Sequence, residues 1–285
     1  CFNTAHQHIF AEPGHNQTLQ AESLMCKSVH ESVDKIHPGF VLTAEFTGYD
    51  HLAANLDGAL NYTIFSRNDD ELRPVPLSIF RFYFPEHKMY VLDSSTSDQG
   101  KKFAFWNAMG AFELFYPAAY EHVLEENGDA FSNKNNTPLI ATLLPRVYAN
   151  QFRAADKSIT LIYNARKFTV DEPVLKVLSD AQHHYFDLLN NRELTVSENT
   201  LSMLMHSGDV AAVARLPKVL SVQNDSLMLA KVPTNAALTI CDKDGNELWR
   251  QKVTNSRVTL PATLLIGTAA IKLFSGKYLV DAIAL

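Results

Sequence analysis

The sequence has little of several features that would narrow its function. Its three cysteines, Cys1, Cys26 and Cys241, lie far apart and form no CxxC pair, which excludes a disulfide framework and a cysteine zinc site. The net charge is −6 and the pI is about 6.0, so the basic face that broad nucleic-acid binding requires is not indicated. No apolar run approaches the roughly 18 residues of a membrane helix. We therefore expect neither a nucleic-acid partner nor a membrane segment.

The common catalytic and cofactor motifs are also missing from the sequence. It contains no GxSxG, no Walker loop and no GxGxxG, which removes the usual serine-hydrolase and nucleotide-binding interpretations. His6 and His8 form a His-x-His pair, and His15 follows in the same stretch. No carboxylate or cysteine stands at a convincing metal-ligand spacing from them, so we expect no metal site and no cofactor.

The composition is that of a chain with a sizeable core. It has 285 residues, 46% of them apolar, which is enough for one or two domains with small additions. The first 16 residues, CFNTAHQHIFAEPGHN, read as a loop and carry no charged and apolar leader. We expect the chain to be part of a longer protein.

The first half of the sequence predicts an α/β layered fold. Apolar residues spaced by three and four predict a helix over residues 17–36, ended by His-Pro-Gly. The near-continuous apolar run FVLTAEF, residues 40–46, has the pattern of a parallel strand that is buried on both faces. Further strands are predicted at GALNYTIF, LSIFRFYF and MYVLD. Residues 100–126 predict a long aromatic helix with a kink at Pro117.

The second half predicts antiparallel sheets. Beyond about residue 146, short alternating segments such as VYANQF, SITLIYNA and VAAVARL are separated by Asn, Asp and Gly turns, which is typical of a sandwich. A second all-β unit begins at about Val219. Within it, Asp244-Gly245 is a strong hairpin-turn signal.

Glu45 is the best candidate for chemistry in the sequence. An isolated charge is costly to bury, so a carboxylate that ends an apolar strand is expected at the exposed end of that strand. Active sites of parallel α/β barrels are built at the carboxyl ends of the strands. Beside Phe46 and Tyr49, the carboxyl group of Glu45 can hold a raised pKa and act as a general acid. The alternative is a structural carboxylate that binds backbone groups or an arginine.

Other polar residues have a structural and a functional interpretation. Asp50 follows the strand and either serves the site or caps a short helix. Arg81 lies between Phe80 and Phe82, and a buried arginine needs a carboxylate partner in the protein or on a ligand. Tyr83, on the same predicted strand face as Arg81, either stacks on a sugar ring or packs.

Several stretches resemble a known family. FVLTAEFTGYDHLAANLDGALNY, LSIFRFYFPEHKMYVLD, FWNAMGAF and ENGDAF, continued by ITLIYNA and HYFDLLNNREL, are similar to an uncharacterised family of glycoside-hydrolase-like (β/α)8 barrels. That family is distantly similar to α-amylase and α-galactosidase type enzymes, and the resemblance covers roughly residues 1–216. It implies the C-terminal part of a TIM-type barrel over 1–145 and an antiparallel β-sandwich over 146–218. The strand pattern that follows predicts a small all-β, Ig-like domain over 219–285.

The resemblance also implies a mechanism. Glycosidic bonds of an oligo- or polysaccharide would be cleaved by two carboxylates, with Glu45 as the acid/base. The second carboxylate would come from earlier barrel strands in the missing N-terminal part of the chain. Arg81, Tyr83 and either His8 or His15 would orient sugar hydroxyls, with Asp50 also near the substrate, and Glu86 is a reserve carboxylate. Without those earlier strands, little or no activity is expected from this part alone.

Two non-catalytic alternatives stay open. One is a carbohydrate-binding or cell-surface module whose sandwiches bind glycans or partner domains. The other is a barrel without activity that shapes an assembly. A second acid about 5–10 Å from Glu45 would favour the enzyme. A row of exposed aromatic residues on a sandwich face would favour the binding module, and Trp249, which alternates with Arg250, is interpreted as packing.

Overall fold

Two compact units make up the chain, with unit 1 spanning Cys1–Tyr116 and unit 2 spanning Pro117–Leu285. The structure is a computed structural model that describes residues 15–45, 52, 54–61, 79–91, 98–111, 116–223, 226–260 and 268–285. The predicted first boundary was at 145/146, whereas α5 (Ala118–Glu126) and α6 (Gly128–Phe131) belong to unit 2. The predicted division into three domains stays a prediction.

Unit 1 contains a sheet whose strands are all parallel. The strands follow one another in the order β1-β2-β3-β4, so each strand lies beside its successor in the sequence. A doubly wound sheet would reverse this order at some point. The bounds are β1 (Thr43–Glu45), β2 (Gly58–Asn61), β3 (Lys88–Val91) and β4 (Gly110–Ala111).

Helix α1 (His15–Asp34) precedes this sheet, close to the predicted 17–36. Its Cys26 is buried in a small apolar cluster with Leu52 and Leu56, and Leu42 packs against that cluster. The residues just before β1 and β2 therefore rest on α1. None of the described helices is long and apolar enough to cross a membrane.

Two predictions in the first half of the chain are wrong. LSIFRFYF, predicted as a strand, contains the helix α3 (Ile79–Tyr83). The predicted continuous helix over 100–126 is two helices, α4 (Asp98–Trp106) and α5, with β4 between them. Pro117 does not kink a helix but stands at the N-cap of α5, where the missing N–H of proline costs no hydrogen bond.

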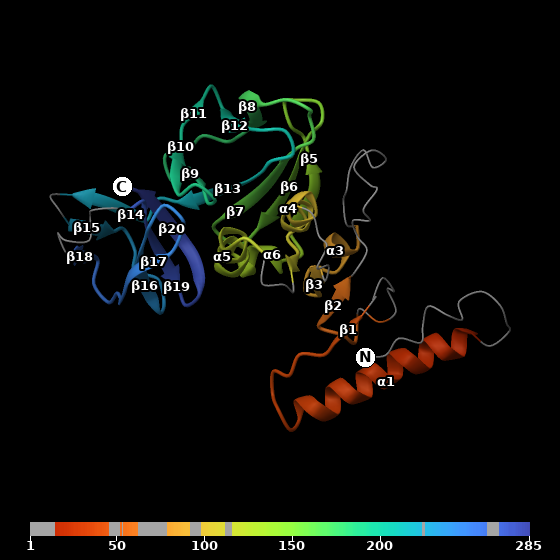
Figure 1. The fold of residues 1–285 in the computed structure, drawn as a ribbon. Helices are drawn as coiled ribbons and strands as arrows, with labels where there is room; N and C mark the ends of the chain where they lie inside the picture. Colours follow the sequence, from red (N-terminus) through yellow and green to blue (C-terminus); the bar gives the residue numbers. More distant parts are fainter. Residues whose placement is uncertain are drawn as a thin grey trace. The chain divides into compact units, whose positions relative to one another are not determined.

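Unit 2 begins with α5 and α6 and continues with antiparallel strands (Figure 1). The larger sheet has the order β10-β9-β13-β7-β6-β5, and the smaller sheet has the order β11-β12-β8. The two sheets share one hydrophobic cluster, which includes Ala149, Ile162 and Val213 from the larger sheet and Leu175 and Leu201 from the smaller. The bounds are β5 (Asn136–Ile140), β6 (Val147–Arg153), β7 (Ser158–Asn164), β8 (Val170–Lys176), β9 (His183–Asp187), β10 (Arg192–Leu194), β11 (Val196–Ser197), β12 (Thr200–Met205) and β13 (Val210–Pro217).

The C-terminal part of unit 2 has its own core, which includes Leu227, Leu238 and Ile271. Gly245, with φ of +84°, forms the predicted Asp-Gly turn between β16 and β17. The strands form sheets in the orders β14-β15-β18 and β17-β16-β19-β20. Their bounds are β14 (Leu220–Gln223), β15 (Ser226–Leu229), β16 (Ala236–Cys241), β17 (Glu247–Lys252), β18 (Arg257–Thr259), β19 (Ala270–Ser275) and β20 (Tyr278–Ala284).

Buried lysines attach the two helices of unit 2 to its strands. Lys272 on β19 donates from Nζ to both carboxylate oxygens of Glu126, at 3.0 and 2.9 Å. The Nζ of Lys157 lies 2.9 Å from Asp129 Oδ1 and donates to the backbone oxygen of Leu279 at 2.6 Å. Burial lowers the pKa of Lys157, against the charge and hydrogen bond of Asp129, which raise it. These ion pairs keep the buried ammonium groups partnered.

Candidate functional site

The carboxyl edge of the parallel sheet is the first candidate site. Glu45 is the last residue of β1, and it pairs in register with Leu60 of β2. The next strands reach the same edge, because Asn61 pairs with Val91 and Val91 pairs with Ala111. The backbone of Glu45 therefore ends a parallel strand, as the sequence predicted, while its side chain lies outside the described residues.

The opposite, amino edge of the sheet is held by Asp57. Its Oδ2 accepts a hydrogen bond from the backbone N–H of Leu42 at 2.8 Å and lies 2.9 Å from Nε2 of His30 on α1. The backbone N–H of Asp57 in turn donates to the carbonyl of Leu42, also at 2.8 Å. Asp57 thus connects α1, the start of β1 and the start of β2, which fixes the strand that carries Glu45.

Arg81 is buried, but on a helix and not on a strand. It is 3% exposed, and its Nε donates to the backbone oxygen of Ala108 at 3.0 Å. Ala108 has a positive φ of 52° in the turn between α4 and β4, so Arg81 supports an irregular turn. Burial lowers the pKa of Arg81 to about 10, which leaves the guanidinium protonated at neutral pH. The sequence predicted a carboxylate partner for Arg81, and the acceptor for its Nε is instead the backbone carbonyl of Ala108.

Arg81, Tyr83 and Glu86 are not brought together at the Glu45 edge of the sheet. The strand prediction placed Tyr83 on the face of Arg81, but two residues along a helix point about 200° apart. Tyr83 is 77% exposed, in agreement with the helix. Glu86 is exposed and stands two residues before β3. It therefore lies toward the amino edge of the sheet, whereas Glu45 ends its strand at the carboxyl edge.

The remaining predicted site residues fall where the structure gives no side-chain geometry. His8 and Asp50 lie outside the described residues. His15 is the first residue of α1, and its side chain lies outside the description. Within the part of the chain that the structure describes, no group of three or more His, Cys, Asp or Glu side chains is arranged to hold a metal ion. Substrate contacts by these three residues stay predictions.

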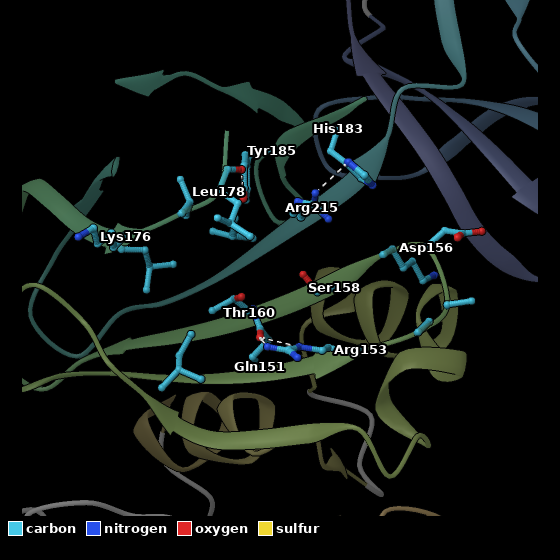
Figure 2. A pocket seen from close by; sticks show the side chains of 17 residues that line it. Gln151, Arg153, Asp156, Ser158, Thr160, Lys176, Leu178, His183, Tyr185 and Arg215 are labelled. Carbon is cyan, nitrogen blue, oxygen red and sulfur yellow. Dashed lines mark hydrogen bonds between the residues drawn. The ribbon is translucent and has the colours of Figure 1, made fainter. Parts of the chain in front are cut away.

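A pocket in unit 2 is a second candidate site, which the sequence did not predict. It has a volume of about 600 Å³ and lies on the larger sheet, bordered by the segment that follows β8. Figure 2 shows Arg215 and His183 on one side and Gln151 with Arg153 on the other, with Ser158 and Thr160 between them. Gln151 Oε1 accepts from Nε and Nη2 of Arg153, at 2.8 and 2.6 Å.

Strand register brings the polar side chains of this pocket together. Arg153 of β6 pairs with Ser158 of β7, Ser158 pairs with Arg215 of β13, and Arg215 pairs with Tyr185 of β9. Paired residues in an antiparallel sheet point to the same face, so these four side chains form one row across the sheet. The next row contains Gln151, which pairs with Thr160.

The guanidinium of Arg215 is oriented by Asp180, in the loop between β8 and β9, and by His183, the first residue of β9. Its Nη2 donates to Asp180 Oδ2 and lies 2.9 Å from Nδ1 of His183. His183 Nδ1 is also 2.8 Å from Asp180 Oδ1. The hydrogen bond from His183, supported by Arg215, keeps the pKa of Asp180 well below its usual range. Asp180 is therefore an anion at neutral pH and orients the side chains of both His183 and Arg215.

The signal that could have found this pocket is weak in the sequence. On one face of residues 147–153, the apolar Val147 and Ala149 are followed by the polar Gln151 and Arg153. The same change occurs on β13, where Val213 is followed two residues later by Arg215. A change from apolar to polar residues on one strand alone is typical of a strand that leaves the core. Only the strand register shows that the polar ends of β6 and β13 lie on the same face of the sheet.

Comparison with known proteins gives structural matches alone. No family model matches the sequence, and a search of curated proteins gives no match. Among solved structures, the chain resembles an α-amylase from Geobacillus thermoleovorans complexed with acarbose, with 9% identity and a TM-score of 0.43 over 69% of this chain and 57% of that one. It also resembles the maltogenic α-amylase AmyB from Thermotoga neapolitana, with 10% identity and a TM-score of 0.45 over 68% and 58%.

An α-galactosidase from Mortierella vinacea is similar as well, with 7% identity and a TM-score of 0.47 over 69% of this chain and 63% of that one. These three solved structures belong to the enzyme classes that the sequence resemblance names, and their identities to this chain are 9%, 10% and 7%. The chain spans a little over half of the α-amylase structure. Because these TM-scores are below 0.5, no residue role is transferred from the solved structures to this chain.

Proposed function

We propose that unit 1 is the C-terminal part of a (β/α)8 barrel in a glycoside-hydrolase-like protein, and that Glu45 is the acid/base of its site. The observation that carries the proposal is the position of Glu45 at the end of a strand in a parallel sheet that winds in one direction. In a barrel, each strand is added beside the previous one, and catalytic side chains stand at the carboxyl ends of strands. The substrate class is an oligo- or polysaccharide.

The chemistry requires a second carboxylate. Glycoside hydrolases protonate the leaving oxygen with one carboxylic acid, while the other carboxylate attacks the sugar or activates water. Glu86 stands toward the amino edge of the sheet, so we assign the second role to a carboxylate from earlier barrel strands of the longer protein. Arg81, which is buried against Ala108, would then shape the turn before β4 and not contact the sugar.

The test compares Glu45→Gln with the wild type in the protein at its natural length. Hydrolysis would be measured on natural oligosaccharides and on 2,4-dinitrophenyl glycosides. A general acid contributes about 10²–10⁴-fold, so we expect a loss of that size on oligosaccharides. The loss should be smaller on dinitrophenyl glycosides, because their leaving group departs without protonation. This difference between substrates separates an acid from a residue that merely supports the fold.

Glu31→Gln is the matched control, since Glu31 is an exposed carboxylate on α1 of the same unit. It should leave both rates unchanged. Equal rates for Glu45→Gln and wild type would remove Glu45 from the acid role. Absence of hydrolysis by the wild type on the whole panel would contradict the enzymatic proposal.

A non-catalytic carbohydrate-binding module is the second candidate function. The pocket of unit 2 favours it, because side chains of several hydrogen-bonding types line a concave part of a sheet. Saccharide binding to the protein, with no hydrolysis and no effect of Glu45→Gln, would favour this function over the first.

A further inference from the structure

The pocket of unit 2 carries an excess of positive charge. Arg153, Lys157, Lys176 and Arg215 line it, against the single carboxylate of Asp156 among the lining residues. Lys157 forms an ion pair with Asp129 and Arg215 forms one with Asp180, so the charges of these two side chains are balanced within the protein. Within the described residues, Arg153 and Lys176 form no ion pair with a carboxylate. An anion is the ligand that this distribution of charge attracts.

Two guanidinium groups flank the floor of the pocket. Arg153 and Arg215 both pair with Ser158, from the strands on its two sides. Adjacent strands lie about 4.8 Å apart, so the two arginine backbones are separated by roughly 10 Å on the same face. Long side chains at that separation can both reach a small anion above Ser158. Guanidinium groups bind carboxylates through two parallel N–H bonds.

Arg215 also has an unused donor. Its Nε is buried and has no hydrogen-bond partner within the described residues, although Nη2 binds Asp180. A buried donor without an acceptor is costly, and proteins rarely leave one without a partner. Because Asp180 fixes the other end of the guanidinium, Nε has a fixed position beside the pocket that Arg215 lines. The guanidinium of Arg215 is therefore held in place at the pocket by Asp180.

The rest of the lining fits a ligand with hydroxyl groups. Gln151, Ser158 and Thr160 contribute an amide and two hydroxyls to the floor. The hydroxyl of Tyr185 donates to the backbone oxygen of Leu178, which fixes the ring in the wall of the pocket. A volume of about 600 Å³ is in the range of small-ligand sites.

We propose that this pocket binds a carboxylate-bearing sugar, of the uronic-acid type, with the carboxylate between Arg153 and Arg215. The anionic character of the ligand follows from the pocket itself. The choice of a sugar acid over other small carboxylates rests on the proposed function. The pocket is a binding site in unit 2, and hydrolysis at Glu45 in unit 1 does not depend on its occupation.

The test measures binding of D-glucuronate and D-galacturonate to the whole protein by calorimetry, with D-glucose and D-galactose as neutral counterparts. We expect the acids to bind at least tenfold more tightly than the neutral sugars. Arg153→Gln should weaken the binding of the acids roughly tenfold or more, the size of a lost charge-assisted hydrogen bond. Arg153 is exposed, so the variant should fold. Higher salt should weaken the binding, because exposed charges are screened.

Arg250→Gln is the matched control, since Arg250 is an exposed arginine on β17 with Glu247 as its partner. It should leave the affinity unchanged. Glu45→Gln should also bind the acids normally, so a failure of the enzymatic proposal is distinguishable from a failure of this one. Equal binding of neutral sugars, or unchanged affinity in Arg153→Gln, would overturn the proposal. Binding of acetate and inorganic phosphate as tight as that of the sugar acids would overturn the sugar-acid assignment.

Discussion

His184 is expected to make the stability of unit 2 depend on pH. The ring is buried between two carboxylates, with Nε2 2.7 Å from Asp281 Oδ1 and Nδ1 3.3 Å from Glu193 Oε1. Both nitrogens can donate at once only in the protonated ring. Asp281, which is fully buried, also accepts the backbone N–H groups of Val219 and Leu220, at 2.7 and 2.6 Å. This network joins the larger sheet to the C-terminal strands.

The direction of the pH effect follows from the pKa of His184. Burial lowers this pKa, but the hydrogen bond and charge of Asp281, with Glu193 on the other side, outweigh burial and raise it overall. A folded pKa above the unfolded value of about 6.5 gives stability that is complete below the unfolded pKa. That stability is lost as pH rises through the higher, folded pKa. Unit 2 should therefore lose this contribution as the pH rises from about 6.5 through the raised pKa of His184.

The size of the stability change can be worked out for a variant that lacks Asp281, one partner of His184. Breaking a buried ion pair on one side costs about 3–5 kcal/mol, because the other charge stays buried. Unit 2 spans Pro117–Leu285, and a domain of that size shifts its Tm by roughly 2–4 °C per kcal/mol. Asp281→Asn should therefore lower the Tm of unit 2 by roughly 6–20 °C at pH 6.

Thermal unfolding at pH 6 would measure the change in Tm of Asp281→Asn. Urea unfolding at pH 6 and pH 9 would test the pH dependence that His184 is expected to cause. The free energy of unfolding should differ between wild type and His184→Gln more at pH 6 than at pH 9. His206→Gln is the control, because His206 is exposed and its ring lies 3.1 Å from a hydroxyl group, that of Thr169. A difference between wild type and His184→Gln that stays constant or grows toward pH 9 would refute the reasoning.

Two further predictions concern the C-terminal strands. Burial raises the pKa of the Cys241 thiol to about 11, so a thiol reagent at pH 8 should label it slowly in the folded protein and rapidly in urea; equal rates would contradict its burial. Gly245 has a positive φ of 84°, so Gly245→Val should lower the free energy of unfolding by about 1–2 kcal/mol, and Gly245→Asn by less, because asparagine tolerates this conformation. Equal effects of the two substitutions would show that conformation is not the cause.

The sequence predicted the antiparallel strands of unit 2 better than the elements between the parallel strands. Short segments rich in β-branched and aromatic residues, such as residues 147–153 and 158–164, favour a strand over a helix. Ile79–Tyr83 is too short and too apolar for that distinction, and packing decides it. Arg81 is buried while Ile79 and Tyr83 are exposed, which fits a helix, since residues two apart on a helix point in nearly opposite directions. Nothing in the local sequence indicates that Arg81 is the buried residue.

The break in the predicted helix over 100–126 has a similar origin. Residues 98–106 form the expected helix, but Gly110 and Ala111 pair with Tyr90 and Val91 of β3. A sheet partner 20 residues away is a tertiary contact, and apolar residues spaced by three and four do not indicate it. The turn at Ala108, with its positive φ and its hydrogen bond from Arg81, is then required to redirect the chain.

The two candidate sites differ in how far sequence could lead to them. The sequence alone can identify Glu45 as a candidate, because the strand and the acid that ends it form one continuous segment of the chain. The pocket of unit 2 depends on pairings between Arg153, Ser158, Arg215 and Tyr185, which lie on β6, β7, β13 and β9 and up to 62 residues apart. Register in a sheet is set by the hydrophobic face, and here the apolar pairs Ala149–Ile162 and Ile162–Ala211 set it. The same pairing that buries those residues must bring the two arginines to either side of one serine, so the cationic row is a consequence of the core.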